Sequence, residues 1–94
     1  MTKYGEVIQK SISGTFDGWY RIITEDSNGV VHDFHIPFSL SHGPDSFYVD
    51  FEWENVEHDF EEDGTENHEI IRCPEEFKEI AQENQQDIIR KANV

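Results

Sequence analysis

The sequence predicts an α+β fold, in which an antiparallel β-meander of four to five strands carries a C-terminal α-helix on one face. Ten isoleucines accompany a single leucine, and β-branched side chains suit a pleated strand. Two Asp-Gly or Asn-Gly pairs divide the first half of the chain at hairpin spacing. The C-terminal residues instead repeat apolar side chains at helical spacing. We expect residues 1–94 to form a single small acidic domain.

The first three strands are predicted to meet at Asp17-Gly18 and Asn28-Gly29. Both dipeptides accept positive φ at two successive positions, as a two-residue type I′ hairpin turn requires. Two such turns would align Ile12, Ile23 and Phe34 in one apolar row across the strands. The same register would place Phe16, Trp19 and Ile36 on that buried face.

Residues 7–16 are interpreted as the first strand, although a helix at the start of the chain remains an alternative. Tyr4, Val7, Ile8 and Ile12 also recur at helical spacing, and Gly14 is a suitable C-terminal cap. The predicted pairing of residues 7–16 with the second strand favours a strand over a helix for this segment. Whether residues 4–12 are strand or helix therefore stays open at this point.

The second half of the chain predicts one clear strand, an acidic loop and a helix. Residues 47–54 alternate apolar with polar side chains, which is typical of a half-buried strand. Residues 57–69 read as an acidic loop, and Ile70 and Ile71 as a short fifth strand. Pro74 suits the first position of a helix over residues 74–91. Its buried face would hold Phe77, Ile80, Ala81, Ile88 and Ile89.

Negative charge is concentrated in one continuous part of the sequence. The net charge is −14, and residues 22–71 contain 14 of the 21 acidic residues and no lysine or arginine. A surface that only needed solubility would mix both signs. A concentrated negative field repels nucleic acid and anionic membranes and attracts basic surfaces. We therefore expect a basic protein partner, no direct nucleic-acid binding and no membrane association.

One histidine-containing segment and one acidic segment are candidate metal sites. His32 and His35 are three residues apart, so in a strand they point to opposite faces, and we interpret them as surface histidines. Residues 59–64 match the first half of a calcium loop, with Gly64 at the sixth position. Glu66 and Ile70 then stand where an apolar residue and a bidentate glutamate belong. We predict no dedicated metal site.

The nucleophilic side chains do not form a convincing catalytic pattern. Cys73 lies at the expected start of the helix, where a thiol pKa is lowered, but two glutamates follow it. A partly buried structural thiol is the better interpretation. The loop around Gly43 contains the elements of a triad in adjacent positions, which rarely meet the required geometry; they are Ser39, Ser41, His42 and Asp45. We predict no catalytic residue and no cofactor.

Asp50, Glu52 and Glu54 are the strongest candidates for a binding site. On one strand they would project from a single face about 6.6 Å apart, twice the strand rise, in rough imitation of the phosphates of a nucleic acid. Tyr48 shares that face and would supply an aromatic anchor. The predicted partner-binding residues are Tyr48, Asp50, Glu52, Glu54, Glu57, Asp59, Glu61, Glu62 and Asp63.

This profile resembles, in charge and size alone, phage counter-defence proteins that mimic DNA (anti-restriction and anti-CRISPR proteins) and immunity proteins that neutralise nuclease toxins. The resemblance implies an inhibitor that occupies the basic, nucleic-acid-binding surface of a protein or nuclease. Two alternatives stay open: a divalent-cation-binding domain that uses residues 59–69, and an accessory subunit whose acidic face is only solubilising. The single cysteine and the absence of an apolar N-terminal segment predict a cytoplasmic location, in the host cytoplasm if a phage encodes the chain.

Overall fold

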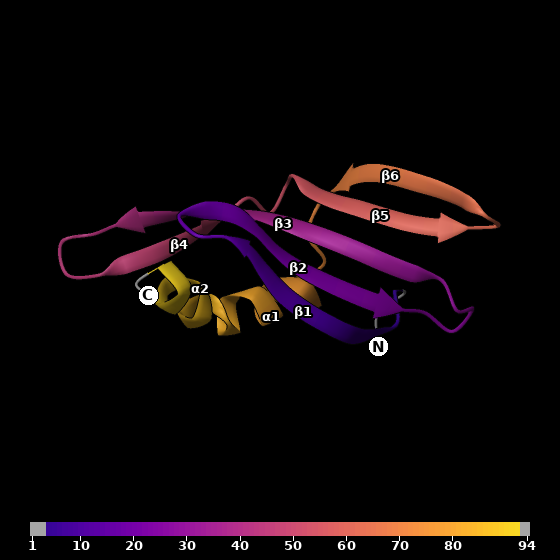
Figure 1. The fold of residues 1–94 in the computed structure, drawn as a ribbon, viewed down its shortest axis with the longest axis horizontal. Helices are drawn as coiled ribbons and strands as arrows, with labels where there is room; N and C mark the ends of the chain where they lie inside the picture. The colour runs from indigo at the N-terminus through magenta and orange to yellow at the C-terminus, as the bar shows by residue number, and fades with distance from the viewer. Residues whose placement is uncertain (1–3, 93–94) are drawn as a thin grey trace.

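The computed structural model describes residues 4–92, which form an antiparallel sheet covered on one face by two helices (Figure 1). The body is elongated, with principal extents of 49 × 22 × 21 Å. The strands run in the order β1-β2-β3-β5-β6, and β4 also pairs with β3. The elements are β1 (Glu6–Gly14), β2 (Asp17–Glu25), β3 (Val31–His42), β4 (Phe47–Phe51), β5 (Val56–Glu62), β6 (Thr65–Ile71), α1 (Glu75–Glu83) and α2 (Gln85–Ala92).

β3 organises the sheet, because one of its edges pairs with two different strands. Phe38–His42 pair with β4, whereas His32–His35 pair with β5. The gap between these ladders falls at Pro37, whose carbonyl oxygen accepts a hydrogen bond from the Glu52 backbone N–H at 2.9 Å. The nitrogen of Pro37 faces the same edge and carries no hydrogen. One long partner strand is therefore interrupted there, and the chain turns over residues 52–55 before β5 begins.

β1 is a strand, as the pairing argument favoured, and the alternative helix is wrong. The predicted first turn is also wrong, because Gly14 pairs with Gly18 and the chain reverses over residues 15–17. Gly14 has φ +92°, and a Cβ there would lie 2.2 Å from the Asp17 carbonyl oxygen. Only glycine permits this earlier reversal. Ile12 consequently pairs with Tyr20 rather than with Ile23.

The second turn contains one residue more than the predicted two-residue loop. The Asp26 N–H donates to the Val30 carbonyl oxygen at 3.0 Å, and Gly29 between them has φ +80°. This is the three-residue hairpin loop that ends in a left-handed glycine. A shift of one residue exchanges the faces of a strand, so Ile22, and not Ile23, pairs with Phe34. Phe16 and Trp19, predicted to be buried, are 57% and 43% exposed, whereas Ile36 is buried as predicted.

The predicted acidic loop over residues 57–69 is in fact the β5–β6 hairpin. Its turn is Asp63-Gly64, where both residues have positive φ, 53° and 77°. This is the type I′ geometry predicted for the two earlier turns. The predicted short strand at Ile70 and Ile71 is the end of β6. The sheet therefore has six strands among the described residues, rather than the four to five predicted.

Two short helices replace the single predicted helix. The interruption is at Asn84, whose side-chain Nδ2 donates to the Ile80 carbonyl oxygen at 2.7 Å and so competes with helical hydrogen bonding. Most of the predicted apolar face is confirmed, since Ile80 packs partly buried against the core and Phe77, Ala81 and Ile88 are buried, whereas Ile89 is only partly buried. The buried helix residues pack on the inner face of the sheet with core residues Tyr20, Ile22, Phe34, Ile36, Phe38 and Val56.

Candidate functional site: the acidic outer face of the sheet

The face of the sheet opposite the helices, hereafter the outer face, collects most of the polar strand positions. Directly paired residues of antiparallel strands project to the same side. Arg21, His35, Glu57 and Ile70 therefore form one row across four strands. The next row along the strands contains Ile23, Asp33, Asp59 and His68.

Asp33 and Asp59 face each other in this second row, and different basic side chains bind them. The Arg21 guanidinium holds Asp33 with its Nε at 3.0 and 3.1 Å and with its terminal nitrogen at 2.6 Å. His68 Nδ1 lies 2.5 Å from Asp59 Oδ1, and this contact raises the pKa of His68. His35 lies between them, with Nε2 at 3.3 Å from Asp33 and Nδ1 at 3.9 Å from Asp59.

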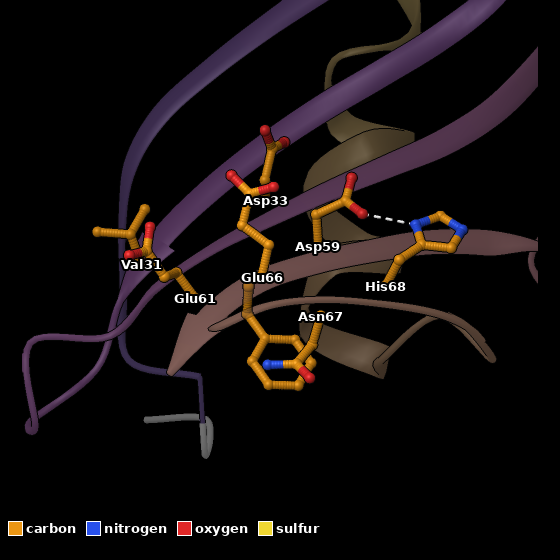
Figure 2. Close-up of a pocket in the computed structure, with 8 residues that line it drawn as sticks. Val31, Asp33, Asp59, Glu61, Glu66, Asn67 and His68 are labelled. Atoms are coloured by element: carbon orange, nitrogen blue, oxygen red, sulfur yellow. Dashed lines mark hydrogen bonds and ion pairs between the residues drawn. The ribbon is translucent and has the colours of Figure 1, made fainter. Parts of the chain in front are cut away.

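The β5–β6 hairpin extends this negative surface. Glu61 pairs with Glu66, so these carboxylates adjoin the Asp33–Asp59 pair on the outer face. Figure 2 shows Asp33, Asp59, Glu61 and Glu66 projecting from the same side of the strands around a shallow hollow. Alternate positions of β5 thus carry outward carboxylates about 7 Å apart. Carboxylates this close repel one another, which lowers the stability of the sheet unless a cationic ligand binds there.

A second hollow on the outer face exposes the indole of Trp19. Pro37 lies beside Trp19, and the acidic residues Asp17 and Glu52 line the same hollow. The indole ring also lies 5.9 Å from the His35 ring. An exposed indole with carboxylates nearby is suited to a guanidinium or ammonium group, which is attracted to both. Sequence reasoning missed this anchor, because the one-residue register error placed Trp19 in the core.

The predicted ladder of Asp50, Glu52 and Glu54 on a single strand is wrong. β4 ends at Phe51, so Glu52 and Glu54 lie in the turn that the proline of β3 imposes. Glu54 contacts Arg72 at 3.3 Å. Asp50 and Tyr48 do lie on β4, on the same side as Ser39 and Ser41 of β3, and Asp50 accepts a hydrogen bond from Ser41 at 2.8 Å. β4 thus contributes Tyr48 and Asp50 to the outer face. Glu52 and Glu54 lie in the following turn and do not continue this row.

Residues 59–69 do not form the calcium loop that one alternative requires. Asp59 and Glu61 lie on the outer face of β5, whereas Glu62 pairs with Thr65 on the opposite side and Asp63 is in the turn. Among residues 4–92, no group of three or more histidine, cysteine, aspartate or glutamate side chains is arranged to hold a metal ion.

The two histidines of β3 point to opposite faces, as predicted, but only one of them is a surface residue. His35 is on the outer face, whereas His32 is 7% exposed and belongs to the inner face. His32 pairs with Thr24, a fully buried residue, because the longer second turn shifts the register by one residue. Its ring contacts His58, a buried residue that the sequence analysis had not singled out.

The remaining candidates for nucleophilic chemistry have other environments. Cys73 is buried, more completely than the partly buried thiol that was predicted, and burial raises the pKa of its thiol to about 12. The Ser41 hydroxyl donates to Asp50, and the His42 ring packs against Phe47 at 4.9 Å between centroids. No hydrogen bond among the described residues joins the serine hydroxyls of β3 to His42 or Asp45.

The positive groups lie mainly away from the outer face. Lys78 of α1 lies 5.4 Å from the Trp53 ring, and Lys91 of α2 donates to the Ile12 carbonyl oxygen. Arg90 pairs with Asp87 on the same helix. Within residues 4–92, Arg21 is the only lysine or arginine at a strand position of the outer face, and Asp33 already binds it. The outer face of the sheet is therefore rich in carboxylates and poor in lysine and arginine.

No protein-family model, curated protein or solved structure matches this chain. In the part of the chain that the structure describes, no helix is long and apolar enough to cross a membrane.

Proposed function

We propose that this protein is an inhibitor whose outer face binds the basic, nucleic-acid-binding surface of a partner protein. The observation that carries the proposal is the group of carboxylates on neighbouring strands β3, β5 and β6. Within residues 4–92, Arg21 is the only lysine or arginine at a strand position of this face, and it is already bound to Asp33. Carboxylates on alternate strand positions and on neighbouring strands present regularly spaced negative charge, as the phosphates of a nucleic acid do.

The outer face would act through many weak contacts and one anchor. An exposed ion pair contributes about 0.2–1 kcal/mol, so no single carboxylate is expected to dominate. Trp19 is the proposed anchor, because aromatic residues surrounded by polar contacts commonly carry most of the binding energy. A partner arginine would stack on the indole and contact Asp17 or Glu52. Tyr48 and Asp50 extend the same surface along β4.

The proposal is tested by reversing charge on two different faces of the protein. One variant carries Glu57→Lys, Glu61→Lys and Glu66→Lys on the outer face. The matched control carries Glu76→Lys, Glu79→Lys and Glu83→Lys on exposed positions of α1 and has the same net charge. Proteins captured from the native host lysate are compared quantitatively for the wild type and both variants.

A basic nucleic-acid-binding protein captured by the wild type and the α1 variant, and lost with the outer-face variant, is the expected result. Moderate salt should weaken this capture, since exposed charges are screened beyond about 8–10 Å. Equal capture by both folded variants would contradict the proposal and would leave the acidic face with a solubilising role.

A further inference from the structure

β6 is an edge strand of the sheet along its whole length. Among residues 4–92 it pairs with β5 alone, and no other described strand lies beyond it. Figure 1 shows β6 at the outside of the sheet, away from the two helices. A sheet edge presents a row of backbone N–H and C=O groups that no strand has paired. The open side of β6, hereafter the β6 edge, is therefore a place where a further strand can be added.

The turn of the β5–β6 hairpin determines which residues point to the β6 edge. A two-residue turn makes the flanking residues, Glu62 and Thr65, a hydrogen-bonded pair. Hydrogen-bonded and non-hydrogen-bonded pairs then alternate along an antiparallel ladder. Glu66, His68 and Ile70 fall at the non-hydrogen-bonded positions. Their backbone N–H and C=O groups therefore face away from β5, where no strand of the described chain pairs with them.

The other edge strands among the described residues, β1 and β4, carry features that hinder strand addition. β1 has a bulge between Val7 and Gln9, and it contains Lys10. Lys91 of α2 also donates to the Ile12 carbonyl oxygen of β1 at 2.9 Å. β4 is only five residues long. Bulges, lysines and short strands are common means by which proteins protect their sheet edges.

None of these features occurs in residues 65–71. The seven residues of β6 pair with β5 without a register shift and include no lysine, arginine or proline. Glu66, His68, Glu69 and Ile70 are all exposed. The strand is negatively charged and the chain has a net charge of −14, so a second copy of this protein would be repelled. The charge of the β6 edge thus disfavours self-association and favours a basic strand.

The side chains of an added strand would meet carboxylates on both faces of the sheet. Directly paired residues project to the same side, so a long basic side chain opposite Glu66 would also approach Glu61, the partner of Glu66 on β5. A residue opposite Glu69 would lie on the inner side, where that carboxylate is 51% exposed. Ile70, which is 53% exposed, would face an apolar side chain. In an antiparallel strand these contacts require the order apolar, basic, any, any, basic.

We propose that the β6 edge binds an extended basic segment of the partner protein as an additional, antiparallel strand of the sheet. Antiparallel pairing gives two hydrogen bonds at each edge-facing position of β6 and is slightly more stable per residue than parallel pairing. The backbone contacts supply affinity, while Glu66, Glu69 and Ile70 select the basic and apolar side chains. The inference rests on the proposed function, because it names how a basic partner is held beside the outer face.

Two synthetic peptides of equal charge test the backbone contacts. The first is acetyl-Thr-Val-Arg-Thr-Thr-Arg-Thr-amide, which has the required order, and its threonines suit an extended strand. The second has the same sequence but carries N-methyl groups on the valine and on the second arginine. These two backbone nitrogens would otherwise donate to Ile70 and Glu66 at the β6 edge. A contact made only by the arginine side chains would not distinguish the two peptides.

Backbone ¹⁵N–¹H spectra of the full chain, recorded as each peptide is added, measure affinity and amide exchange. We expect the first peptide to slow exchange at the edge-facing amides of Glu66, His68 and Ile70. Exchange should change little at Asn67 and Glu69, whose amides already bind β5. The N-methylated peptide should not slow exchange at the edge-facing amides.

The variant His68→Pro removes one edge-facing N–H of the protein. Proline is tolerated on an edge strand where the missing N–H faces solvent, and slow exchange at Asn67 and Glu69 would show that the hairpin is formed. His68→Ala removes the same ring and keeps the N–H, so it is the matched control. We expect the first peptide to bind His68→Pro about twofold to tenfold more weakly than His68→Ala, the range that corresponds to one hydrogen bond.

No binding of the first peptide, equal binding of the two peptides, or equal affinities of the two variants would overturn strand addition. These results are independent of the charge-reversal experiment on the outer face. Loss of capture with the outer-face variant would then still support the proposed function without an added strand. Equal capture by both folded charge-reversal variants would instead contradict the proposed function itself.

Discussion

Asp33 and Asp59 lie directly opposite each other on β3 and β5, so two carboxylates occupy one cross-strand pair of the outer face. Like charges in this position destabilise a sheet. Arg21 binds the first and His68 binds the second, while His35 lies between them. The sheet thus retains a repulsive pair by using its few local basic groups, which is understandable if the negative surface serves binding.

Arg21→Gln should expose this repulsion. We expect the free energy of unfolding to fall by about 1 kcal/mol at low ionic strength, and by less in salt, because screening weakens the repulsion between the two carboxylates. Urea denaturation at two salt concentrations measures both effects. Arg90→Gln, which removes an exposed pair on α2, should change stability by less than about 0.5 kcal/mol. Equal effects of the two substitutions would mean that the Asp33–Asp59 pair is not under strain.

The pH dependence of stability should follow the buried His58. Its pKa in the folded protein is lowered by burial, so between that value and about 6.5 the unfolded chain binds more protons. Stability should therefore decrease as the pH falls below about 6.5, and level off below the folded pKa. Denaturant unfolding from pH 7.5 to pH 5 would measure the slope. His68 acts in the opposite direction, because its raised pKa contributes stability that is lost as the pH rises. A stability that rises on acidification would show that His58 is not the dominant group.

Thr24→Val should stabilise the protein. The Thr24 side chain is fully buried, and its Oγ1 has no hydrogen-bond partner among the described residues. An isosteric valine removes an unsatisfied hydroxyl, for an expected gain of about 1 kcal/mol. Thr65→Val at the exposed start of β6 is the control, with little expected change. Thermal unfolding compares the two, and a destabilised Thr24→Val variant would reveal a hydrogen bond to water at this position.

Two glycine substitutions should differ in cost although both residues have positive φ. A Cβ at Gly64 would meet nothing within 4 Å, so Gly64→Ala should cost only the backbone strain, about 1 kcal/mol. A Cβ at Gly14 would lie 2.2 Å from the Asp17 carbonyl oxygen, so Gly14→Ala should cost clearly more. Equal losses of stability in urea denaturation would show that the reversal after β1 adjusts freely.

The sequence predicts the antiparallel sheet and the apolar helix face, because alternation and helical spacing are local patterns. Register depends on loop length, which the Asn28-Gly29 pair alone does not define. Because this loop is one residue longer than predicted, Ile22 lies on the inner face and Ile23 on the outer face. The same turn signal at Asp63-Gly64 lies in a segment whose many carboxylates predicted an acidic loop over residues 57–69, which concealed the β5–β6 hairpin. The negative charge of the binding surface was visible in composition, whereas its arrangement depends on strand pairing.

The buried contact between His32 and His58 left no comparable signal in the sequence. The two rings come from strands that are adjacent in the sheet but distant in the chain, His32 on β3 and His58 on β5. Only the correct register brings these rings together. Burial of His32 likewise followed from pairing with Thr24, a position that local alternation did not reveal.

The most direct test of the proposed function is competition between this protein and nucleic acid for one partner. A fluorescent DNA or RNA oligonucleotide is bound to the captured partner, and this protein is titrated in while fluorescence anisotropy is recorded. Mimicry predicts that the anisotropy falls to the value of the free oligonucleotide. The outer-face variant with Glu57→Lys, Glu61→Lys and Glu66→Lys should fail to displace it, and the α1 variant should succeed. A stable ternary complex, or displacement by the folded outer-face variant, would contradict the account.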